Sequence, residues 1–354
     1  MKVLVLGAGV IGVTTAYFLR DQGAEVTVVD RQPGPALETS FANGGHLSVG
    51  QAAPWATPEA PWQLLKWAGR RDAPLRLRAR WDPALWRWGL QFLRNCTPGR
   101  FRANSQTLER LAAFSHDCLG NVMRAHPELD FGYQANGLLT VFRTAQALGR
   151  AARQSETTNP VLDSSGCLEV EPALASAVEA GKIAGGILAP DAASGDAQKF
   201  TAQLAAVCAE RGVRFRFGET VSALERVDGA ITGAVTTRGT IAADAVVVAL
   251  GSYSRGLART VGLDLPIVPV KGYSVTLPTN GATAPKLGIL DAERKVVMTV
   301  LGGGLRVAGT AEFAGYDTAL DPLRLAAITA TALDLFPDFR RIAHTPDDRR
   351  PWAG

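Results

Sequence analysis

The sequence predicts an α/β fold in which a Rossmann-like dinucleotide-binding domain is interleaved with a second, α+β domain. Three observations indicate this fold. A strand, a glycine-rich turn, a helix and a second strand occupy the first 30 residues, similar strands return after residue 185, and a further group of strands begins near residue 263. The 354 residues, 47% of them hydrophobic, are enough for about two domains with well-filled cores.

The first 30 residues are predicted to form a βαβ unit. Residues 2–6 are apolar on both faces, as in a buried parallel strand, and residues 13–22 have the pattern of a helix. The sequence GAGVIG lies between them, and a second strand over residues 25–29 ends at Asp30. Asp30 follows Gly12 by 18 positions, which is close to the spacing at which dinucleotide-binding folds place the acidic residue that binds a ribose.

Each residue of this motif has a physical role in holding a dinucleotide. Gly7 permits the tight turn out of the strand, Gly9 lets the backbone approach a pyrophosphate, and Gly12 lets the helix pack closely on the strand. The helix N-terminus offers N–H groups and a positive dipole end to the phosphates. Asp30 can accept hydrogen bonds from both ribose hydroxyls. Because an NADP site usually has an arginine without the acid, Arg31 does not favour NADP. The motif predicts a dinucleotide rather than a merely glycine-rich turn, and it does not separate FAD from NAD.

The composition argues against several other classes. A net charge of +4 is too small to indicate nucleic acid as a partner. The four cysteines form no CxxC pair and the four histidines show no metal-ligand spacing, so no metal site is predicted. No segment approaches the ~18 consecutive apolar residues of a membrane-spanning helix. We therefore expect a cytoplasmic protein, soluble or peripheral to a membrane, whose isolated thiols suit a reducing compartment.

The loop after the second strand favours FAD through a family resemblance. Residues 38–46, ETSFANGGH, closely resemble the corresponding loop of the D-amino acid dehydrogenase small-subunit family, which belongs to the glycine oxidase and D-amino acid oxidase group of flavoproteins. The resemblance continues in order at residues 171–172, 185–198, 243–254, 268–274 and 305–313. It implies FAD as the cofactor and a Rossmann-like FAD-binding domain interleaved with an α+β substrate-binding domain.

The resemblance also implies domain boundaries. We expect residues 1–60 and 185–262 to form the FAD-binding domain, residues 61–184 and 263–330 the substrate domain, and residues 331–354 the start of a further FAD-domain segment. The last three residues, Trp352-Ala353-Gly354, resemble the beginning of the family's C-terminal motif. The sequence is therefore expected to lack the family's C-terminal segment.

The cofactor contacts are assigned partly from the motif and partly from the resemblance. In the family, the positions of Ser40, Asn43, Gly44 and Gly45 lie along the FAD pyrophosphate and flavin, and two adjacent glycines suit close approach of backbone to a flat ligand. The alternative interpretation of this loop is a polar turn before a proline-rich surface segment. The predicted contact residues are Val5, Gly7, Gly9, Val10, Ile11, Gly12, Asp30, Arg31, Ser40, Asn43, Gly44, Gly45, Val221, Ala249, Leu250 and Gly251.

The activity that the resemblance implies is oxidative deamination of D-amino acids such as D-alanine. A hydride moves from Cα to flavin N5, the products are a 2-oxo acid and ammonia, and the electrons pass to a respiratory quinone or another acceptor. One alternative is an oxidase of glycine, sarcosine or a similar amine that uses oxygen. The other is a truncated, non-catalytic remnant that binds FAD, which the missing C-terminal segment would explain.

Five side chains are candidates to face the substrate. His46 follows the glycine pair and is predicted to border the flavin, with a purely structural histidine as the alternative. Tyr273 is predicted to line the substrate pocket, where its hydroxyl can reach a carboxylate. Arg306 is either substrate-facing or an exposed strand residue. Tyr253 and Lys271 complete the set of catalytic candidates.

Residues 54–102 combine tryptophans with arginines in a way that suits a bilayer interface. Two short amphipathic helices are predicted, over residues 60–68 and 83–93. The tryptophans are at 55, 62, 67, 81, 86 and 88, and the arginines are at 70, 71, 76, 78, 80, 87, 94, 100 and 102. We expect peripheral contact with the inner face of the plasma membrane. The alternative is that most of these tryptophans pack in the core of the substrate domain.

Overall fold

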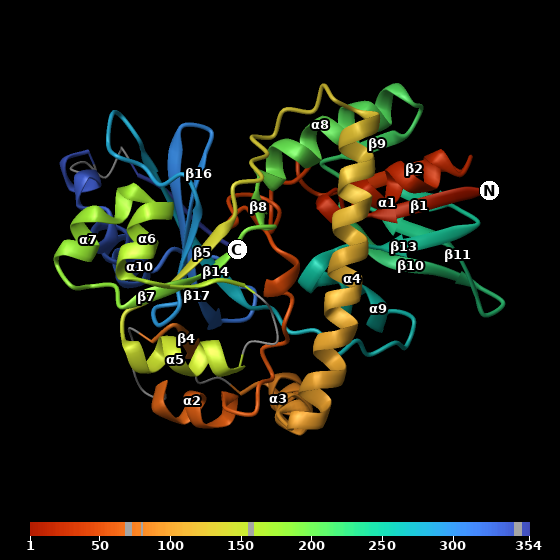
Figure 1. The fold of residues 1–354 in the computed structure, drawn as a ribbon. Coiled ribbons are helices and arrows are strands. Elements are labelled where there is room, and N and C mark those ends of the chain that lie inside the picture. Colours follow the sequence, from red (N-terminus) through yellow and green to blue (C-terminus); the bar gives the residue numbers. More distant parts are fainter. Residues whose placement is uncertain (68–72, 79–80, 155–158, 343–348) are drawn as a thin grey trace. The chain divides into compact units, whose positions relative to one another are not determined.

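The computed structural model describes residues 1–67, 73–78, 81–154, 159–342 and 349–354 (Figure 1). The contacts within the chain divide it into two compact units. Unit 1 consists of Met1–Asn43, Glu128–Phe131 and Ala197–Pro269, and unit 2 consists of Gly44–Pro127, Gly132–Asp196 and Val270–Gly354. The chain therefore crosses between the units five times.

The crossings lie at other residues than the boundaries expected at 60, 184 and 262, because short strand pairings hold the intervening segments in unit 2. Strand β3 (His46–Leu47) pairs with β8 (Ala193–Ser194), so both sides of this small ribbon belong to unit 2. Strand β18 (Arg350–Ala353) pairs with β14 (Lys271–Pro278). The described end of the chain thus continues the sheet of unit 2. From the sequence, it was expected to belong to the dinucleotide-binding domain.

Unit 1 is built on a four-stranded parallel sheet with the order β13-β1-β2-β9. Leu4 and Leu6 face a three-stranded antiparallel sheet, which closes one side of the parallel sheet. Helices α1 and α8 pack against each other, and α1 packs on β1 and β2. The elements are β1 (Lys2–Leu6), α1 (Val10–Asp21), β2 (Glu25–Asp30), α8 (Ala197–Glu210), β9 (Arg214–Phe217), β10 (Val221–Val227), β11 (Ala230–Thr236), β12 (Gly239–Ala242), β13 (Ala245–Val248), η3 (Gly251–Tyr253) and α9 (Ser254–Arg259).

Unit 2 is built on a mixed sheet in which β18, β14, β17, β16, β15, β5, β7 and β6 follow one another and β4 pairs with β17. Its further strands are β4 (Leu75–Leu77), β5 (Leu138–Phe142), β6 (Val161–Asp163), β7 (Gly185–Ala189), β15 (Gly288–Asp291), β16 (Val296–Leu301) and β17 (Gly304–Phe313). Its helices are η1 (Val49–Gln51), α2 (Ala60–Trp67), α3 (Pro83–Asn95), α4 (Pro98–Ala125), α5 (Ala145–Gln154), α6 (Ser164–Val170), η2 (Pro172–Leu174), α7 (Ala175–Glu179), α10 (Pro322–Leu335) and η4 (Pro337–Arg341).

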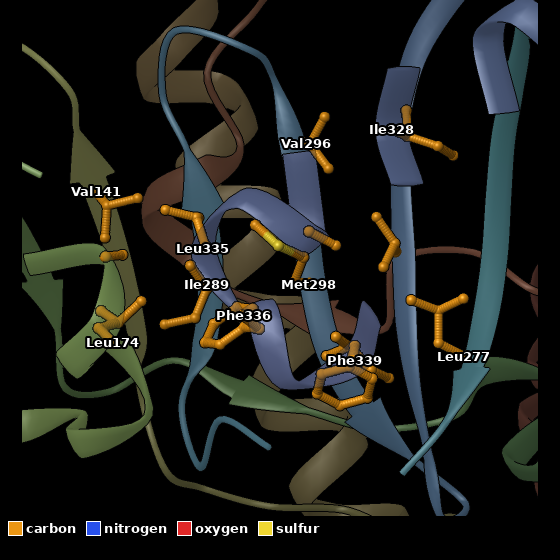
Figure 2. Close-up of a cluster of buried hydrophobic side chains, with 14 of the residues drawn as sticks. Val141, Leu174, Leu277, Ile289, Val296, Met298, Ile328, Leu335, Phe336 and Phe339 are labelled. Atoms are coloured by element: carbon orange, nitrogen blue, oxygen red, sulfur yellow. The ribbon is translucent and has the colours of Figure 1, made fainter. Parts of the chain in front are cut away.

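The main core of unit 2 lies on one face of this sheet. Ile289, Met298 and Leu277 from the strands meet Phe336 and Phe339 from the end of α10 and from η4, as Figure 2 shows. All five side chains are at most 1% exposed. Strand alternation places the intervening residues on the opposite face.

The opposite face carries polar side chains at its centre. Arg306 on β17 is paired with Thr276 on β14 and with Thr299 on β16, so these three side chains stand in one row across the sheet. Ser274 lies two residues before Thr276 and shares this face. We call Ser274, Thr276, Thr299 and Arg306 the polar face of unit 2.

A β-bulge at Thr310 interrupts the alternation of β17. Tyr273 is opposite Gly309, but Gly272 is opposite Ala311 and Lys271 is opposite Glu312, so Thr310 is an extra residue. Its φ of 60° is in the left-handed region, which is unusual for a β-branched side chain. The bulge changes the face of every residue after it. Glu312 therefore points to the same side as Tyr273 instead of joining the polar face.

Candidate functional site

The glycine turn of unit 1 has the close approaches that the motif predicts. Gly7 has a φ of 105°, and a Cβ there would lie 2.5 Å from the carbonyl oxygen of Ala249. A Cβ on Gly12 would overlap the carbonyl oxygen of Gly7. Helix α1 begins at Val10, three residues before the expected start, so Gly12 lies inside the helix. Its missing side chain is what lets the helix approach the end of β1.

Two side chains from elsewhere in the chain support this turn. The Asp30 carboxylate accepts hydrogen bonds from the backbone N–H of Ala8 at 2.6 Å and of Gln32 at 2.8 Å. Burial raises the pKa of Asp30, and the two backbone hydrogen bonds oppose this shift. Ser40 Oγ accepts a hydrogen bond from the backbone N–H of Val10 at 2.9 Å, at the start of α1. Each carboxylate oxygen can accept further hydrogen bonds, so Asp30 can also accept hydrogen bonds from the hydroxyl groups of a ribose.

Tyr253 lies in unit 1, beside Arg31. The Arg31 guanidinium is 3.9 Å from the centre of the Tyr253 ring, and its Nε donates to Glu38 Oε1 at 2.6 Å. Tyr253 was predicted to face the substrate. The structure places it next to the residue that follows Asp30, at the ribose end of the predicted cofactor site, so the substrate-facing role is not supported.

The remaining predicted contacts of unit 1 are distributed over several of its elements. Val5 is fully buried in the middle of β1, and Ile11, 65% exposed, is on the first turn of α1. Ala249 and Leu250 follow the end of β13 directly, and Gly251 begins η3. Val221 opens β10, and Asn43 is the last residue of unit 1 before the crossing to unit 2.

Gly44 and Gly45 belong to unit 2 and have a packing role there. A Cβ on Gly44 would lie 2.6 Å from Val297 Cγ2, and one on Gly45 would lie 2.5 Å from Leu301 Cδ1. The Gly44 carbonyl also accepts a hydrogen bond from Thr299 Oγ1 at 3.0 Å. The two glycines were predicted to allow close approach to a flat ligand. In the structure they allow the loop to lie directly on the polar face.

His46 lies over β15 with one ring nitrogen unpaired. A Cβ on Gly288 would be 2.9 Å from His46 Nε2, and Gly288 shares the polar face by alternation with Ile289 of the core. Nε2 is buried and has no hydrogen-bond partner among the described residues. Burial lowers the pKa of His46 to about 4, and a hydrogen bond to the Met298 backbone partly opposes this shift. The ring is therefore neutral at physiological pH.

Contacts with Thr276 and Asp196 hold Arg306 on the polar face. Its Nε donates to Thr276 Oγ1 at 2.6 Å, and its Nη2 is 3.9 Å from Asp196 Oδ2. The side chain is 13% exposed. Burial lowers the pKa of Arg306, although the Asp196 charge opposes the shift, and the guanidinium remains charged at neutral pH. Arg306 is thus not an exposed strand residue, and it presents a planar cation that can bind a carboxylate.

Tyr273 and Lys271 do not fit the substrate-facing role predicted for them. Both are at most 3% exposed, on the core side of the sheet. The Tyr273 hydroxyl donates to Glu312 Oε2 at 2.6 Å, and burial together with this hydrogen bond raises the pKa of Tyr273. Lys271 Nζ donates to the Ala319 carbonyl at 2.7 Å. The Tyr273 hydroxyl does reach a carboxylate, but the carboxylate belongs to the protein.

Glu312 is the centre of this buried ion cluster. Arg78 donates to it at 2.7 Å, and the nearest nitrogens of Arg76 and Lys271 are 3.4 and 3.7 Å away. Burial alone would raise the pKa of Glu312, but the hydrogen bonds from Arg78 and Tyr273 and the charge of Arg78 outweigh it and lower the pKa. The cluster ties β4 to the end of β17.

Three residues around Arg306 were missed in the sequence. Asp196 was read only as part of a family-like segment, and Thr276 and Thr299 were not singled out. The two-glycine turn between Leu301 and Gly304 could have placed Thr299 opposite Arg306 from the sequence, whereas the pairing of Arg306 with Thr276 depends on a tertiary register. In the part of the chain that the structure describes, no three His, Cys, Asp or Glu side chains are grouped to hold a metal ion. Among these same residues, no helix combines the length and the apolar character needed to cross a bilayer.

A comparison with protein families assigns the whole chain to one of them. Residues 2–354 match the model of the DAO family, described as FAD dependent oxidoreductase. The chain therefore belongs to the DAO family of FAD-dependent oxidoreductases, and its cofactor is FAD.

Curated relatives cover the chain almost completely. The chain is 46% identical over 362 residues to the D-amino acid dehydrogenase of Paramagnetospirillum magneticum, a match that covers 100% of this chain and 84% of that protein. It is also 46% identical over 344 residues to the D-amino acid dehydrogenase of Rhizobium rhizogenes, with 95% of this chain and 82% of that protein covered.

Solved structures confirm the fold. Glycine oxidase from Geobacillus kaustophilus has a TM-score of 0.72 at 21% identity, covering 100% of this chain and 82% of that one. L-proline dehydrogenase from P. horikoshii has a TM-score of 0.69 at 16% identity, covering 100% of this chain and 80% of that one. At this level of identity the likeness concerns the fold alone.

The residues of unit 1 fit the FAD that the family requires. Gly7 and Gly12 let the turn and α1 pack directly on neighbouring backbone, the N-terminus of α1 has Gly9 as its N-cap residue with no side-chain cap, and Asp30 lies at the end of β2. These features suit a pyrophosphate and a ribose.

Proposed function

We propose that this protein catalyses the FAD-dependent oxidative deamination of D-amino acids. The observation that carries the proposal is the 46% identity to a D-amino acid dehydrogenase over the whole chain. The polar face of unit 2 supports it, because Arg306, which is half-buried, lies on this face and the neutral His46 ring lies over the same side of the sheet. These groups suit an α-amino acid, which has a carboxylate and an amino group on one carbon.

The chain's own residues bind and orient the reactants. Gly7, Gly9, Gly12 and Asp30 would hold the cofactor's pyrophosphate and ribose. When bound, FAD supplies the oxidant by accepting a hydride from the substrate Cα. Arg306 pairs with the substrate carboxylate and fixes the orientation of Cα. The substrate amine releases a proton to solvent as the imino acid forms, and water then replaces nitrogen to give a 2-oxo acid and ammonia.

The absorption spectrum of the FAD-loaded protein tests this proposal. Anaerobic addition of D-alanine is expected to bleach the flavin, and L-alanine at the same concentration is the control. Loss of the flavin colour with both enantiomers would contradict the D-specificity, and loss with neither would contradict the activity. Glycine and sarcosine added in the same way test the alternative amine oxidase.

The electron acceptor is proposed to be a respiratory quinone. The relatives' names specify dehydrogenases, which supports an acceptor other than oxygen. A soluble quinone analogue is expected to reoxidise the reduced protein much faster than dissolved oxygen does, as measured by stopped-flow absorbance. Rapid stoichiometric formation of hydrogen peroxide would instead favour an oxidase.

Peripheral contact with a membrane is proposed through the tryptophan-rich segment. Four of its six tryptophans are exposed, by 63% at Trp55, 70% at Trp62, 91% at Trp81 and 53% at Trp86, so the alternative of core packing fails for these four. Trp88 instead packs 5.4 Å from Phe313. Arg70, Arg71 and Arg80 lie outside the described residues.

Helix α3 shows the clearest amphipathic surface of this segment. Trp86, Leu90 and Leu93 follow a spacing of four and three residues and are 53%, 61% and 47% exposed. Arg87 and Arg94 are exposed beside them. Rings and aliphatic chains flanked by cations suit the interface of a membrane with anionic lipids.

Flotation with lipid vesicles tests the membrane contact. Vesicles with anionic lipid are expected to carry the protein upward, and purely zwitterionic vesicles less so. The double variant Trp86→Ser, Leu90→Ser is expected to lose at least half of the bound fraction, whereas Val227→Ser, an exposed residue of β10 in unit 1, is the control. Unchanged flotation of the double variant would contradict the proposal.

A further inference from the structure

The strongest unexplained feature of unit 2 is the unpaired ring nitrogen of His46. Two observations place it near the charged side chain of the polar face. Gly288, which the ring overlies, is on β15, and Arg306 is on β17, with β16 between them. Two strand spacings separate the two positions by about 10 Å.

The segment 194–196 gives a second, independent link between the two side chains. Ser194 pairs with His46, and Asp196 is 3.9 Å from Arg306 Nη2. Two residues of chain span at most about 7 Å. This short segment therefore runs from the strand partner of His46 to a neighbour of the Arg306 guanidinium, so both side chains border the same part of the polar face.

The hydrogen-bonding state of His46 defines what it can bind. The hydrogen bond to the Met298 backbone favours the charged ring, as expected when a ring N–H donates to a carbonyl. Because Nε2 has no partner among the described residues, the donor is Nδ1 and Nε2 carries the lone pair of a neutral imidazole. A buried acceptor without a donor costs free energy unless a ligand or water supplies one. Ser194 Oγ, on the paired strand, is likewise buried and unpaired among the described residues.

We propose that His46 Nε2 accepts a hydrogen bond from the substrate's α-amino group while Arg306 binds the carboxylate. This inference rests on the proposed function and assigns His46 a positioning contact, not the role of a base. A ring that stays neutral to about pH 4 does not retain the proton that the amine loses. The substrate is thereby recognised as an amino acid and not merely as a carboxylic acid.

Comparing an amino acid with its deaminated analogue tests the assignment. In the FAD-loaded protein, the Kd of D-alanine is obtained from the concentration dependence of anaerobic flavin reduction, and the Kd of propionate from the change in the flavin spectrum. For His46→Leu we expect the Kd of D-alanine to rise about tenfold and that of propionate to change less than twofold. For Arg306→Met we expect both to rise.

Two further variants separate a contact from a structural role. His46→Gln keeps an acceptor atom near the position of Nε2 and is expected to stay within threefold of wild type for D-alanine. Gly288→Ala leaves every polar group in place but puts a methyl group 2.9 Å from Nε2, so it is expected to weaken D-alanine binding and spare propionate. If His46→Leu does not fold, the Kd values of the His46→Gln and Gly288→Ala variants still test the contact.

The outcomes distinguish this inference from the proposed function. Equal weakening of D-alanine and propionate in His46→Leu, or an unchanged Kd of D-alanine in both His46→Leu and Gly288→Ala, would overturn the contact while the activity stands. Should D-alanine fail to reduce the wild-type flavin, the proposed function fails. The Kd of D-alanine is then read from the spectral change alone, with the same expectations for the variants.

Discussion

At the residue scale, single atoms decide whether the glycine turn can form. The position of Gly12 inside α1 brings the helix backbone against the Gly7 carbonyl, so any side chain there must displace one of them. Gly256 is also inside a helix, but a Cβ on it would meet nothing within 4 Å. The two glycines of the same unit therefore form a matched pair.

Gly12→Ala is expected to lower the free energy of unfolding by about 3 kcal/mol through overpacking and to abolish FAD binding. Gly256→Ala is expected to keep FAD and to gain up to about 1 kcal/mol from its higher helix propensity. Urea unfolding and the ratio of flavin to protein after purification measure both effects. Normal flavin content in Gly12→Ala would contradict the close approach of α1 to β1.

The protonation of His46 predicts a loss of stability in mild acid. Burial lowers the pKa of His46 from 6.5 to about 4, so between these values the unfolded chain binds more protons than the folded one. The contribution of His46 to stability is full above about pH 6.5 and is lost as the pH falls toward 4, by up to about 3 kcal/mol. Urea midpoints at pH 7.5 and 4.5 should fall further apart in wild type than in His46→Gln. An equal pH dependence of the two proteins would show that His46 is not buried as described.

At the scale of elements, the bulge in β17 determines which side chains meet. Thr310 adopts a left-handed conformation that costs a β-branched residue free energy, and its buried Oγ1 has no partner among the described residues. The bulge places Glu312 on the same side as Tyr273 and Lys271. The contacts made there offset the free-energy cost at Thr310. The ion cluster around Glu312 therefore depends on the strained conformation of Thr310.

Thr310→Gly is expected to raise the free energy of unfolding by about 1 kcal/mol, because glycine adopts this conformation without steric cost. Thr240→Gly, at an exposed position of β12, is expected to lower it by about 0.5–1 kcal/mol. Thermal unfolding followed by circular dichroism gives both values. A loss in Thr310→Gly as large as that in Thr240→Gly would mean that no relievable strain resides at the bulge.

The elements also show where prediction from the sequence succeeds and where it stops. The strand, turn and helix of residues 2–21 follow from local residue types, so β1 was predicted with its observed bounds and α1 with a start three residues late. The orientation of Tyr273 depends instead on which face of β14 meets α10. That is set by pairings with residues far along the chain, and the bulge at Thr310 gives no signal in the sequence. Gly44 and Gly45 were recognised as important, but their contact with β16 needed the tertiary fold.

At the scale of the whole molecule, the residues predicted to bind FAD and the tryptophans report on different units. Gly7, Gly12 and Asp30 are in unit 1, whereas all seven tryptophans lie in unit 2. Tryptophan fluorescence therefore follows the unfolding of unit 2, and far-UV circular dichroism follows both units. The five crossings of the chain predict that the units unfold together.

Excess FAD is expected to raise the free energy of unfolding measured by tryptophan fluorescence and by circular dichroism. At 100 times its Kd, a ligand of the folded state adds about 2.7 kcal/mol to the free energy of unfolding. The urea midpoints from fluorescence and from circular dichroism should shift by the same amount, and neither should shift in Gly12→Ala. A shift confined to circular dichroism would show that unit 2 unfolds independently of unit 1.

The same crossings impose an order on the biosynthesis of the protein. Strand β1 leaves the ribosome well before its partner β13, which begins only at residue 245. At about 5–20 residues per second, β1 waits on the order of 10–50 s with one edge unpaired. An unpaired edge of apolar residues is open to aggregation during that time. Strand β2 pairs with the other edge of β1 and α1 packs on β1, so the edge that receives β13 stays unpaired until residues 245–248 have been made.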